Sequence, residues 1–423
     1  MLPDPTSDSN HFQEFPLVDL AQLRLFLEEL VCNLCREQHV AEGLSPGQVL
    51  IRQEVRVAED AFADILVSPE GRAPYFVEVD HGYGPMRLRR SLARKYARRP
   101  PVAREARKVV LVVDLRRHED PAGLIEALEA EIDDSLSLEV WDEERLGSML
   151  ETTFGFGLDL LTPTTIQTAR EAVDRTKGRK ALGEQYQDDA LDAALLWHLG
   201  YWQLAEYARG GRWPKSSVLS PGTYQDVIVV IADITGFTRF VRDTPSSRVV
   251  RDSLAAFYSK TRYQIIHSGG MVLQFVGDSV VALFGVPRPR PGYVEAALDC
   301  AEMLLSIGDS VVTEWQRQID QVQPVSGAHV GIALGDVQLL SLRPFGRSRL
   351  SAIGGSINLA SRMMEHAGNG EILVSNAVQT MISTTYRKRL HDLDPLEISG
   401  MGRIRAWRYE PPARQRVMLP ERR

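Results

Sequence analysis

The sequence has few cysteines and no long apolar segment. Three cysteines in 423 residues are an odd and sparse set, which excludes the disulfide framework of a small secreted domain. Cys32 and Cys35 form a CxxC inside an apolar helical pattern. Because no second pair completes a zinc site, we expect both thiols to pack in a core. No stretch is apolar over the length that spans a bilayer, and the first residues lack the pattern of a leader peptide. We therefore expect a cytoplasmic protein.

The sequence also lacks an excess of positive charge. It has 49 basic and 56 acidic residues, and its net charge of −7 gives no general attraction to nucleic acid or to an anionic membrane. A polyanion would therefore have to bind at a local site. The composition, 44% hydrophobic and 25% charged, is typical of a globular protein, and the length predicts two or three domains.

The first third of the chain, residues 15–155, predicts an α/β domain because strands alternate with helices. The run KVVLVVDL is so continuously apolar that we expect a central strand there. Residues 156–223 have a mostly helical pattern and predict a helical connector. The expected elements of the first domain are helices over 17–38, 86–98, 122–133 and 143–152, and strands over 49–57, 62–67, 75–79 and 108–115.

The rest of the chain, residues 224–412, predicts a second domain. Its strands and helices follow one another in the order of a βαββαβ sheet, with helices packed on one face. The run GGMVLQFVGDSVVALFG is apolar on both sides of a Gly-Asp pair, as in a hairpin that turns at that pair. We expect helices over 247–267, 293–321 and 356–367, and strands at VIVVIAD, SGAHVGIALGD, VQLLSL, EILVS and 404–409.

Two aspartates stand at the ends of expected strands. Asp233 ends VIVVIAD, and Asp278 occupies the expected hairpin turn. If the first strand lies beside the hairpin, the two carboxylates converge, and paired oxygen ligands are what two magnesium or manganese ions require. The alternative is that each acid only caps a turn.

Two further segments fit the chemistry of a nucleotide site. Residues 234–238 form a strand-to-helix turn whose backbone amides could hold phosphate oxygens. Asn358 and Arg362 are four residues apart on an expected helix and so share one face. An amide can orient a ribose, and a guanidinium can share the charge that grows on a phosphorus during transfer. Such a pair can equally be a solvated helix face.

Taken in order, the segments with these residues resemble the signatures of the class III adenylate and guanylate cyclases. They are ADITGFT, FVGDSVVALFG and AIGGSINLASR. The resemblance covers residues 224–409 and implies a ferredoxin-like domain that closes a nucleoside triphosphate into a 3′,5′-cyclic monophosphate. It implies two divalent ions, Mn²⁺ or Mg²⁺, and a homodimer in which the aspartates of one subunit face the Asn and Arg of the other. The implied metal ligands are Asp233, Asp278 and the carbonyl of Ile234, the transition-state pair is Asn358 and Arg362, and the phosphate-binding turn is Thr235, Gly236, Phe237 and Thr238.

Two more positions bear on the choice of base. The family usually has Lys and Asp there for adenine, or Glu and Cys for guanine, whereas this chain has Gln274 and Arg349. Arg349 can only donate hydrogen bonds and so opposes the amino group of adenine, while the Gln274 carbonyl could accept N3–H of uracil. This departure looks like the pyrimidine cyclases of bacterial Pycsar antiphage systems, which implies a cyclic nucleotide that activates an effector. We expect UTP as the substrate, with CTP or ATP as alternatives; Arg349 could also point to solvent.

The N-terminal domain resembles restriction-endonuclease-like folds. FADILVSPEGRAPYFVEVDHG places Asp64 and Glu78 at the spacing of the metal-binding acids of those folds, but Asp80 stands where they have a lysine. We therefore expect a regulatory or sensing module rather than an active nuclease, and an unrelated α/β domain is the alternative. A basic helix follows, which could contact a polyanion or be a solvated face. Its basic residues are Arg87, Arg89, Arg90, Arg94 and Lys95.

Overall fold

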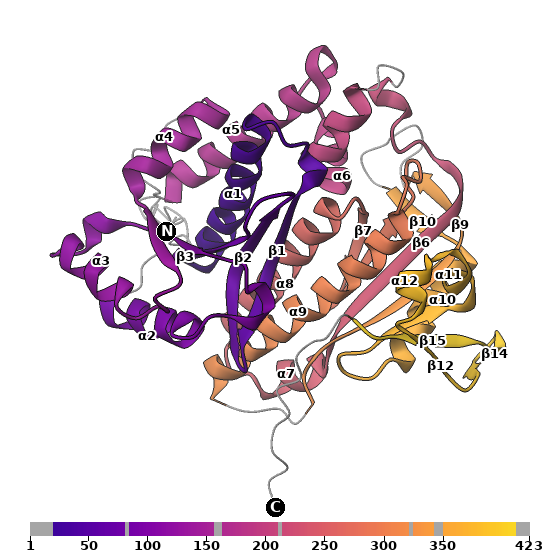
Figure 1. The fold of residues 1–423 in the computed structure, drawn as a ribbon. Coiled ribbons are helices and arrows are strands. Elements are labelled where there is room, and N and C mark those ends of the chain that lie inside the picture. The colour runs from indigo at the N-terminus through magenta and orange to yellow at the C-terminus, as the bar shows by residue number, and fades with distance from the viewer. Residues whose placement is uncertain are drawn as a thin grey trace, which may run out of the picture.

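A computed structural model describes residues 20–80, 84–155, 163–209, 214–320, 325–341 and 350–411. Each half of the chain builds one large mixed sheet. Helices α8 (Ser247–His267) and α9 (Tyr293–Ile319) lie between strand β1 (Val49–Ala58) of the first sheet and strand β6 (Gly222–Thr235) of the second (Figure 1). No helix in these ranges is both long and apolar enough to cross a bilayer.

The N-terminal domain is a five-stranded sheet with helices on both faces. Its helices are α1 (Leu20–Ala41), α2 (Pro85–Tyr96), α3 (Pro121–Glu129) and α4 (Glu143–Phe154), and its strands are β1, β2 (Ala61–Pro69), β3 (Tyr75–Asp80), β4 (Lys108–Val113) and β5 (Ser137–Trp141). The order is β1-β2-β3-β4-β5, antiparallel from β1 to β3 and parallel from β3 to β5. α1 and α4 cover one face, and α2 and α3 cover the other.

The two cysteines of α1 belong to this core. Cys32 and Cys35 are fully buried free thiols, and burial raises the pKa of Cys35 to about 12. The expectation of core packing is confirmed. The expected helices and strands of this domain are also present, but sequence analysis missed β5, because only Trp141 of that strand is buried and its apolar signal is weak.

The connector forms two helices, α5 (Pro163–Leu182) and α6 (Ala190–Arg209), which pack against each other. Leu195 and Leu199 of α6 also pack on the second sheet. The helix is broken at Gly200, which has a φ of 68°. A Cβ at Gly200 would lie 2.3 Å from Cγ2 of Ile266 in α8, so only glycine fits this close approach.

The second domain contains a sheet of eight strands in the order β12-β15-β11-β9-β6-β8-β7, with β10 beside β9. Strand β9 is continuous, where sequence analysis expected two separate strands. Besides α8 and α9 the helices are α7 (Phe237–Asp243), α10 (Gly355–His366), α11 (Asn376–Met381) and α12 (Thr384–Arg387). Besides β6 the strands are β7 (Met271–Val276), β8 (Ser279–Phe284), β9 (Gly327–Ser341), β10 (Leu350–Ile353), β11 (Ile372–Ser375), β12 (Leu390–Asp392), β13 (Leu396–Ile398), β14 (Gly402–Ile404) and β15 (Ala406–Tyr409).

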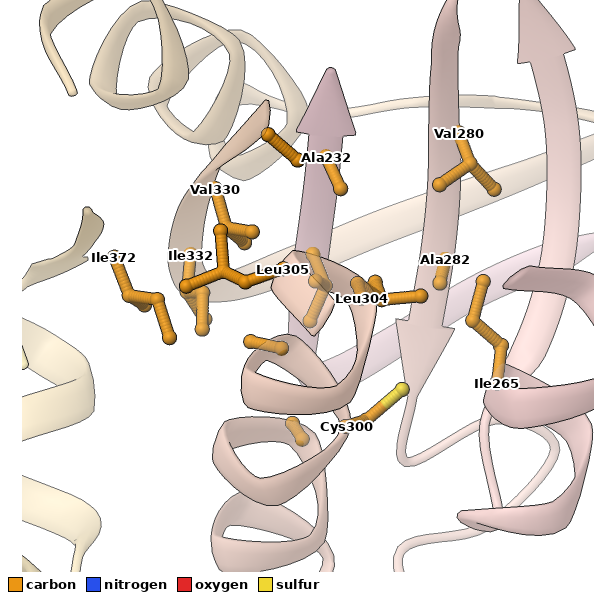
Figure 2. Packing of buried hydrophobic residues seen from close by; sticks show 14 of the residues in the cluster. Ala232, Ile265, Val280, Ala282, Cys300, Leu304, Leu305, Val330, Ile332 and Ile372 are labelled. Atoms are coloured by element: carbon orange, nitrogen blue, oxygen red, sulfur yellow. The ribbon is translucent and has the colours of Figure 1, made fainter. Parts of the chain in front are cut away.

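Strand β6 is apolar on both of its faces. Ile228 and Val230 point to the core beneath α8 and α9, which Figure 2 shows from close by with Leu304 of α9 facing the strands. Val229 and Ile231 point to the opposite core, beneath α6 and α10. The expectation of helices on one face is therefore wrong, because a central strand that is apolar on both sides needs cover on both.

The two domains meet in a buried junction between β1 and the helices α8 and α9. Tyr263 of α8 is 2% exposed and belongs to the core of the N-terminal domain. Lys260 of α8 places its Nζ 2.6 Å from Oε2 of Glu28 and also pairs with Glu54. Ser306 of α9 donates to the backbone oxygen of Glu54 at 2.5 Å. The side chain of Glu54 thus lies among groups of the second domain. The backbone of Glu54 has a φ of 53°.

Candidate metal and nucleotide site

The fold brings Asp233 and Asp278 together. Asp233 lies near the end of β6, which pairs with β8, so the β7–β8 turn that holds Asp278 lies beside it. Ser279 donates a hydrogen bond from Oγ to Oδ1 of Asp233 at 2.5 Å. Burial raises the pKa of the Asp278 carboxyl to about 7, and the neighbouring Asp233 carboxylate adds to the rise. Two carboxylates that disfavour each other's charge form a site that a cation would stabilise.

A histidine that sequence analysis missed completes this cluster. His329 of β9 lies directly opposite Asp233 in the β6–β9 ladder, and its Nε2 is 3.8 Å from Oδ2 of Asp233. Its Nδ1 is hydrogen bonded to Oγ1 of Thr235 at 2.8 Å. Burial lowers the pKa of His329 against the pull of Asp233, so the ring is neutral at physiological pH. The only signal in the sequence is a polar residue at the fourth position of an expected strand, whose register the sequence does not fix.

A tyrosine from α8 supports the turn of Asp278. Tyr258 donates a hydrogen bond from its hydroxyl to the backbone oxygen of Gly277. Its ring lies 4.4 Å from the ring of Phe275, measured between centroids, at an interplanar angle of 31°. Both contacts are with the β7–β8 hairpin, so α8 holds the backbone that carries Asp278. Sequence analysis missed this residue as well.

The expected phosphate-binding turn follows Asp233. Gly236 has a φ of 78° and precedes the first turn of α7, a conformation that favours glycine. The ring of Phe237 packs edge-on against the ring of Trp315, with centroids 6.0 Å apart, so its side chain anchors the turn. Ile234 is 1% exposed, and its side chain is likewise part of the core. The hydroxyl of Thr235 is engaged by His329, and Thr238 lies in the first turn of α7.

Asn358 and Arg362 both lie on α10, which packs closely on β9. A Cβ at Gly331 of β9 would be 2.1 Å from the backbone oxygen of Ala360. The side chain of Arg362 is 48% exposed, and its NH1 is 2.7 Å from Oε2 of Glu365 on the same helix. Within the described ranges, no hydrogen bond or ion pair joins Asn358 or Arg362 to the two aspartates. The single chain therefore does not assemble the two halves of the expected site through such contacts.

Of the two positions expected to specify the base, Gln274 lies within the described residues. Gln274 lies on β7, opposite Val281 of β8 and after an irregularity in the pairing. Its side chain is exposed. Arg349 lies outside the described residues.

The acids of the N-terminal domain form a closed ion-pair cluster. Lys95 of α2 places its Nζ 3.2 Å from Oδ1 of Asp64 and also pairs with Glu78. Asp64, Glu78 and Lys95 are 4%, 5% and 8% exposed. Both acids are thus paired with a lysine from α2. Placing Lys95 among residues that could contact a polyanion was wrong, since an amphipathic helix turns one basic residue inward with its apolar stripe.

A second set of acidic side chains near this cluster is also unsuited to bind a metal ion. One carboxylate oxygen from each of Glu28, Glu54 and Asp64 lies within 4.8 Å of the others. Two buried ammonium groups already occupy this region, because Lys95 pairs with Asp64 and Lys260 pairs with Glu28 and Glu54. The carboxylates are therefore neutralised by lysine, and the cluster joins the domains rather than offering an open cation site.

Comparison with known proteins agrees with the resemblance seen in the sequence of the second domain. Residues 219–410 match the family model described as the adenylate and guanylate cyclase catalytic domain. The adenylate cyclase of Mycobacterium tuberculosis (strain ATCC 25618 / H37Rv) is 28% identical over 196 residues, which are 46% of this chain and 41% of that protein. The chain thus spans less than half the length of the curated relatives it matches.

Two solved structures are also similar to part of this chain. The guanylate cyclase domain of RhGC from Catenaria anguillulae in complex with GTP is 21% identical, with a TM-score of 0.39, over 44% of this chain and 97% of that one. The adenylyl cyclase CyaB from P. aeruginosa is 22% identical, with a TM-score of 0.39, over 46% of this chain and 98% of that one. Residues 219–410 are thus similar, by the family match, to the catalytic domain of adenylate and guanylate cyclases.

Proposed function

We propose that this protein converts a nucleoside triphosphate into its 3′,5′-cyclic monophosphate and diphosphate, with Asp233 and Asp278 holding two divalent ions. The observation that carries the proposal is the meeting of the two carboxylates at the end of β6, where burial and Asp233 raise the pKa of Asp278 to about 7. Carboxylate oxygens are the ligands that Mg²⁺ and Mn²⁺ take in proteins. The donor set therefore fits either metal, and the carbonyl of Ile234 would add a further oxygen.

Other groups would bind the nucleotide and stabilise the transition state. Bound divalent ions would lower the pKa of the ribose 3′-hydroxyl and balance the charge of the triphosphate. The backbone amides of residues 235–238 would hold phosphate oxygens at the start of α7. Asn358 would orient the ribose, and Arg362 would stabilise charge on the transferring phosphorus. The proposed assembly is a homodimer, because Arg362 pairs with Glu365 in the single chain and a second subunit would bring its own Arg362 to the aspartates.

The proposed substrate is UTP, with CTP and ATP as alternatives. The support is chemical: neither pair of residues that usually selects a purine is present, Gln274 can accept from N3–H of uracil, and Arg349 can only donate. The exposed position of Gln274 on β7 leaves its side chain free to meet a base. The proposal extends to a cytoplasmic role in antiphage defence, in which the cyclic nucleotide activates a separate effector protein. Infection of cells that carry Asp233→Asn would test that role, since protection should be lost with the cyclase activity.

A competition assay tests the reaction and the base. The full chain is incubated with Mn²⁺ and all four ribonucleoside triphosphates, and cyclic products are separated and identified by mass. We expect cyclic UMP and diphosphate, no product from Asp233→Asn, and a loss on the order of 10³-fold in Arg362→Ala. Arg403→Ala is the matched control, because Arg403 has a 71% exposed side chain that pairs with Glu397. A dominant cyclic AMP peak would refute UTP, and full activity of Asp233→Asn would refute the metal site.

Mixing two inactive variants tests the dimer. A heterodimer of Asp233→Asn and Arg362→Ala contains one site in which both altered residues fall together and one site that is intact. Random exchange makes about half of the dimers mixed, so about a quarter of wild-type activity should return. If the mixture stays inactive while each variant still dimerises, the aspartates and Arg362 do not come from different subunits.

A nucleic-acid-processing role for the N-terminal domain has less support. Such a role needs Asp64 and Glu78 to reach a metal and a phosphodiester. Both are buried and paired with Lys95, and Tyr96 donates to Glu78 from the same helix. The domain fits the regulatory or sensing role better, because its acids take part in internal ion pairs next to the junction with α8.

A further inference from the structure

We infer that His329 is a third side-chain ligand of the metal site, bound through Nε2 on the same ion as Asp233. The inference rests on the proposed function, because it requires a divalent ion at Asp233 and Asp278. The metal ligands that were expected from the sequence and from the family signatures are all oxygen atoms. His329 adds a nitrogen donor to them.

The sheet fixes the position of the imidazole. Asp233 and His329 are a directly opposed pair of the antiparallel strands β6 and β9, and side chains of such a pair project from the same face. The two side chains are 20% and 14% exposed, so both are partly buried rather than in open solvent. His329 therefore faces the carboxylate without any change in the backbone.

The distance between the two side chains suits a shared ion. Nε2 of His329 is 3.8 Å from Oδ2 of Asp233. Two donor atoms on one octahedral ion with bonds of about 2.1 Å are about 3.0 Å apart when adjacent and about 4.2 Å apart when opposite. The observed separation of 3.8 Å exceeds the adjacent distance by about 0.8 Å, which a small rotation of either side chain would close. It is too long for a hydrogen bond between the two groups. An ion between them would accordingly take the place of a direct contact.

Thr235 holds the ring in the required orientation. Its Oγ1 is 2.8 Å from Nδ1 of His329. Histidines that bind metals nearly always have the second ring nitrogen fixed by such a hydrogen bond. If Nδ1 carries the proton and donates to Thr235, the lone pair of Nε2 is directed away from Thr235 and is available to the ion. Thr235 then acts as a positioning residue for His329, in addition to its place in the expected phosphate-binding turn.

A nitrogen ligand also changes which metal the site prefers. Mg²⁺ strongly favours oxygen donors, whereas first-row transition metals accept imidazole, so the histidine should favour Mn²⁺ over Mg²⁺. His329→Gln should weaken Mn²⁺ binding tenfold or more, while Mg²⁺ binding changes little. Thr235→Val should weaken Mn²⁺ binding by about tenfold, which is typical for loss of the group that orients a ligand.

The direct test is pulsed electron paramagnetic resonance of Mn²⁺ bound to the full chain without nucleotide. We expect electron spin-echo modulation from a directly bound ¹⁴N in the wild type, replaced by the ¹⁵N pattern when histidine is ¹⁵N-labelled. The modulation should vanish in His329→Gln and persist in His391→Gln, the control, since His391 is half-exposed and pairs with Glu410. The wild type with ¹⁵N-labelled histidine tests for a bound histidine even if His329→Gln does not fold.

The outcomes separate this inference from the proposed function. Wild-type protein that binds Mn²⁺ with a strength that depends on Asp233, but without histidine modulation, overturns the ligand role of His329 and leaves the cyclase proposal intact. Mn²⁺ binding that is unaffected by Asp233→Asn overturns the metal site itself. Histidine modulation that persists in His329→Gln also overturns the inference, because another imidazole must then be the ligand.

Discussion

Replacing Lys260 with Met should destabilise the whole protein, although Lys260 lies far along the chain from the N-terminal domain. The ammonium is 8% exposed, 2.6 Å from Oε2 of Glu28, and paired with Glu54. Burial disfavours the charge of Lys260, but Glu28 and Glu54 outweigh burial and raise its pKa above the ordinary value. Methionine would remove the cation and leave two carboxylates in a buried junction.

The expected cost follows from the burial of those carboxylates. Removing one partner of a buried ion pair typically costs about 3–5 kcal/mol, because the other charge remains without compensation. Arg24 stays 2.8 Å from Oε1 of Glu28, so the lower end, about 3 kcal/mol, applies. At roughly 2 °C per kcal/mol for a chain of this size, the melting temperature should fall by about 6 °C.

Differential scanning calorimetry and urea unfolding would measure the change. Lys388→Met is the matched control, because Lys388 is exposed and makes no ion pair within the described ranges. Adding Glu28→Gln and Glu54→Gln to Lys260→Met should recover part of the loss, since the uncompensated charges are then removed. The sign of the pH dependence is also set: a raised lysine pKa contributes stability that is full below 10.5 and is lost only above it. A loss below about 1 kcal/mol would refute the account of the junction.

Three other perturbations test the site and its supports. Tyr258→Phe removes a hydrogen bond of roughly 1 kcal/mol from the turn that holds Asp278, so Mn²⁺ affinity measured by calorimetry should fall about fivefold; an unchanged affinity would contradict its supporting role. Because the pKa of Asp278 is about 7 without metal, protons compete with the ion below that value, and Mn²⁺ affinity should fall about fivefold between pH 7 and about pH 6 but stay level above about pH 8. Gly200→Ala places a Cβ 2.3 Å from the side chain of Ile266 at a φ of 68° and should lower the free energy of unfolding by about 1–3 kcal/mol. Gly47→Ala meets nothing within 4 Å and should change stability little by comparison.

Local patterns predicted most elements of the fold and the two aspartates. The apolar run of β6 and the Gly-Asp turn of the hairpin are short-range signals, and Asp233 and Asp278 occupy the ends of these elements. Pairing of distant segments was not predictable in the same way. His329 reaches Asp233 only through the register of β6 and β9, and a shift of one residue would turn it to the other face.

Sequence analysis also failed to predict which charged side chains are buried. Lys95 and Lys260 both occur in helical patterns rich in polar residues, where a lysine normally faces solvent. Their acidic partners come from β1, β2, β3 and α1. A partner that far away leaves no periodic signal in the helix itself, so neither the closed cluster around Asp64 nor the junction could be read from the sequence.

Helix α8 belongs to two cores at once. Phe257 and Ile265 pack beneath the sheet of the second domain, whereas Tyr263 packs beneath the N-terminal sheet. The limits of the family match, 219–410, therefore do not coincide with the limits of an independently folding unit. A truncation that begins near residue 219 would expose the ring of Tyr263 and the ammonium of Lys260 to water. Exchange of N-terminal domains between related cyclases would likewise have to carry a matching α8 with the transplanted domain.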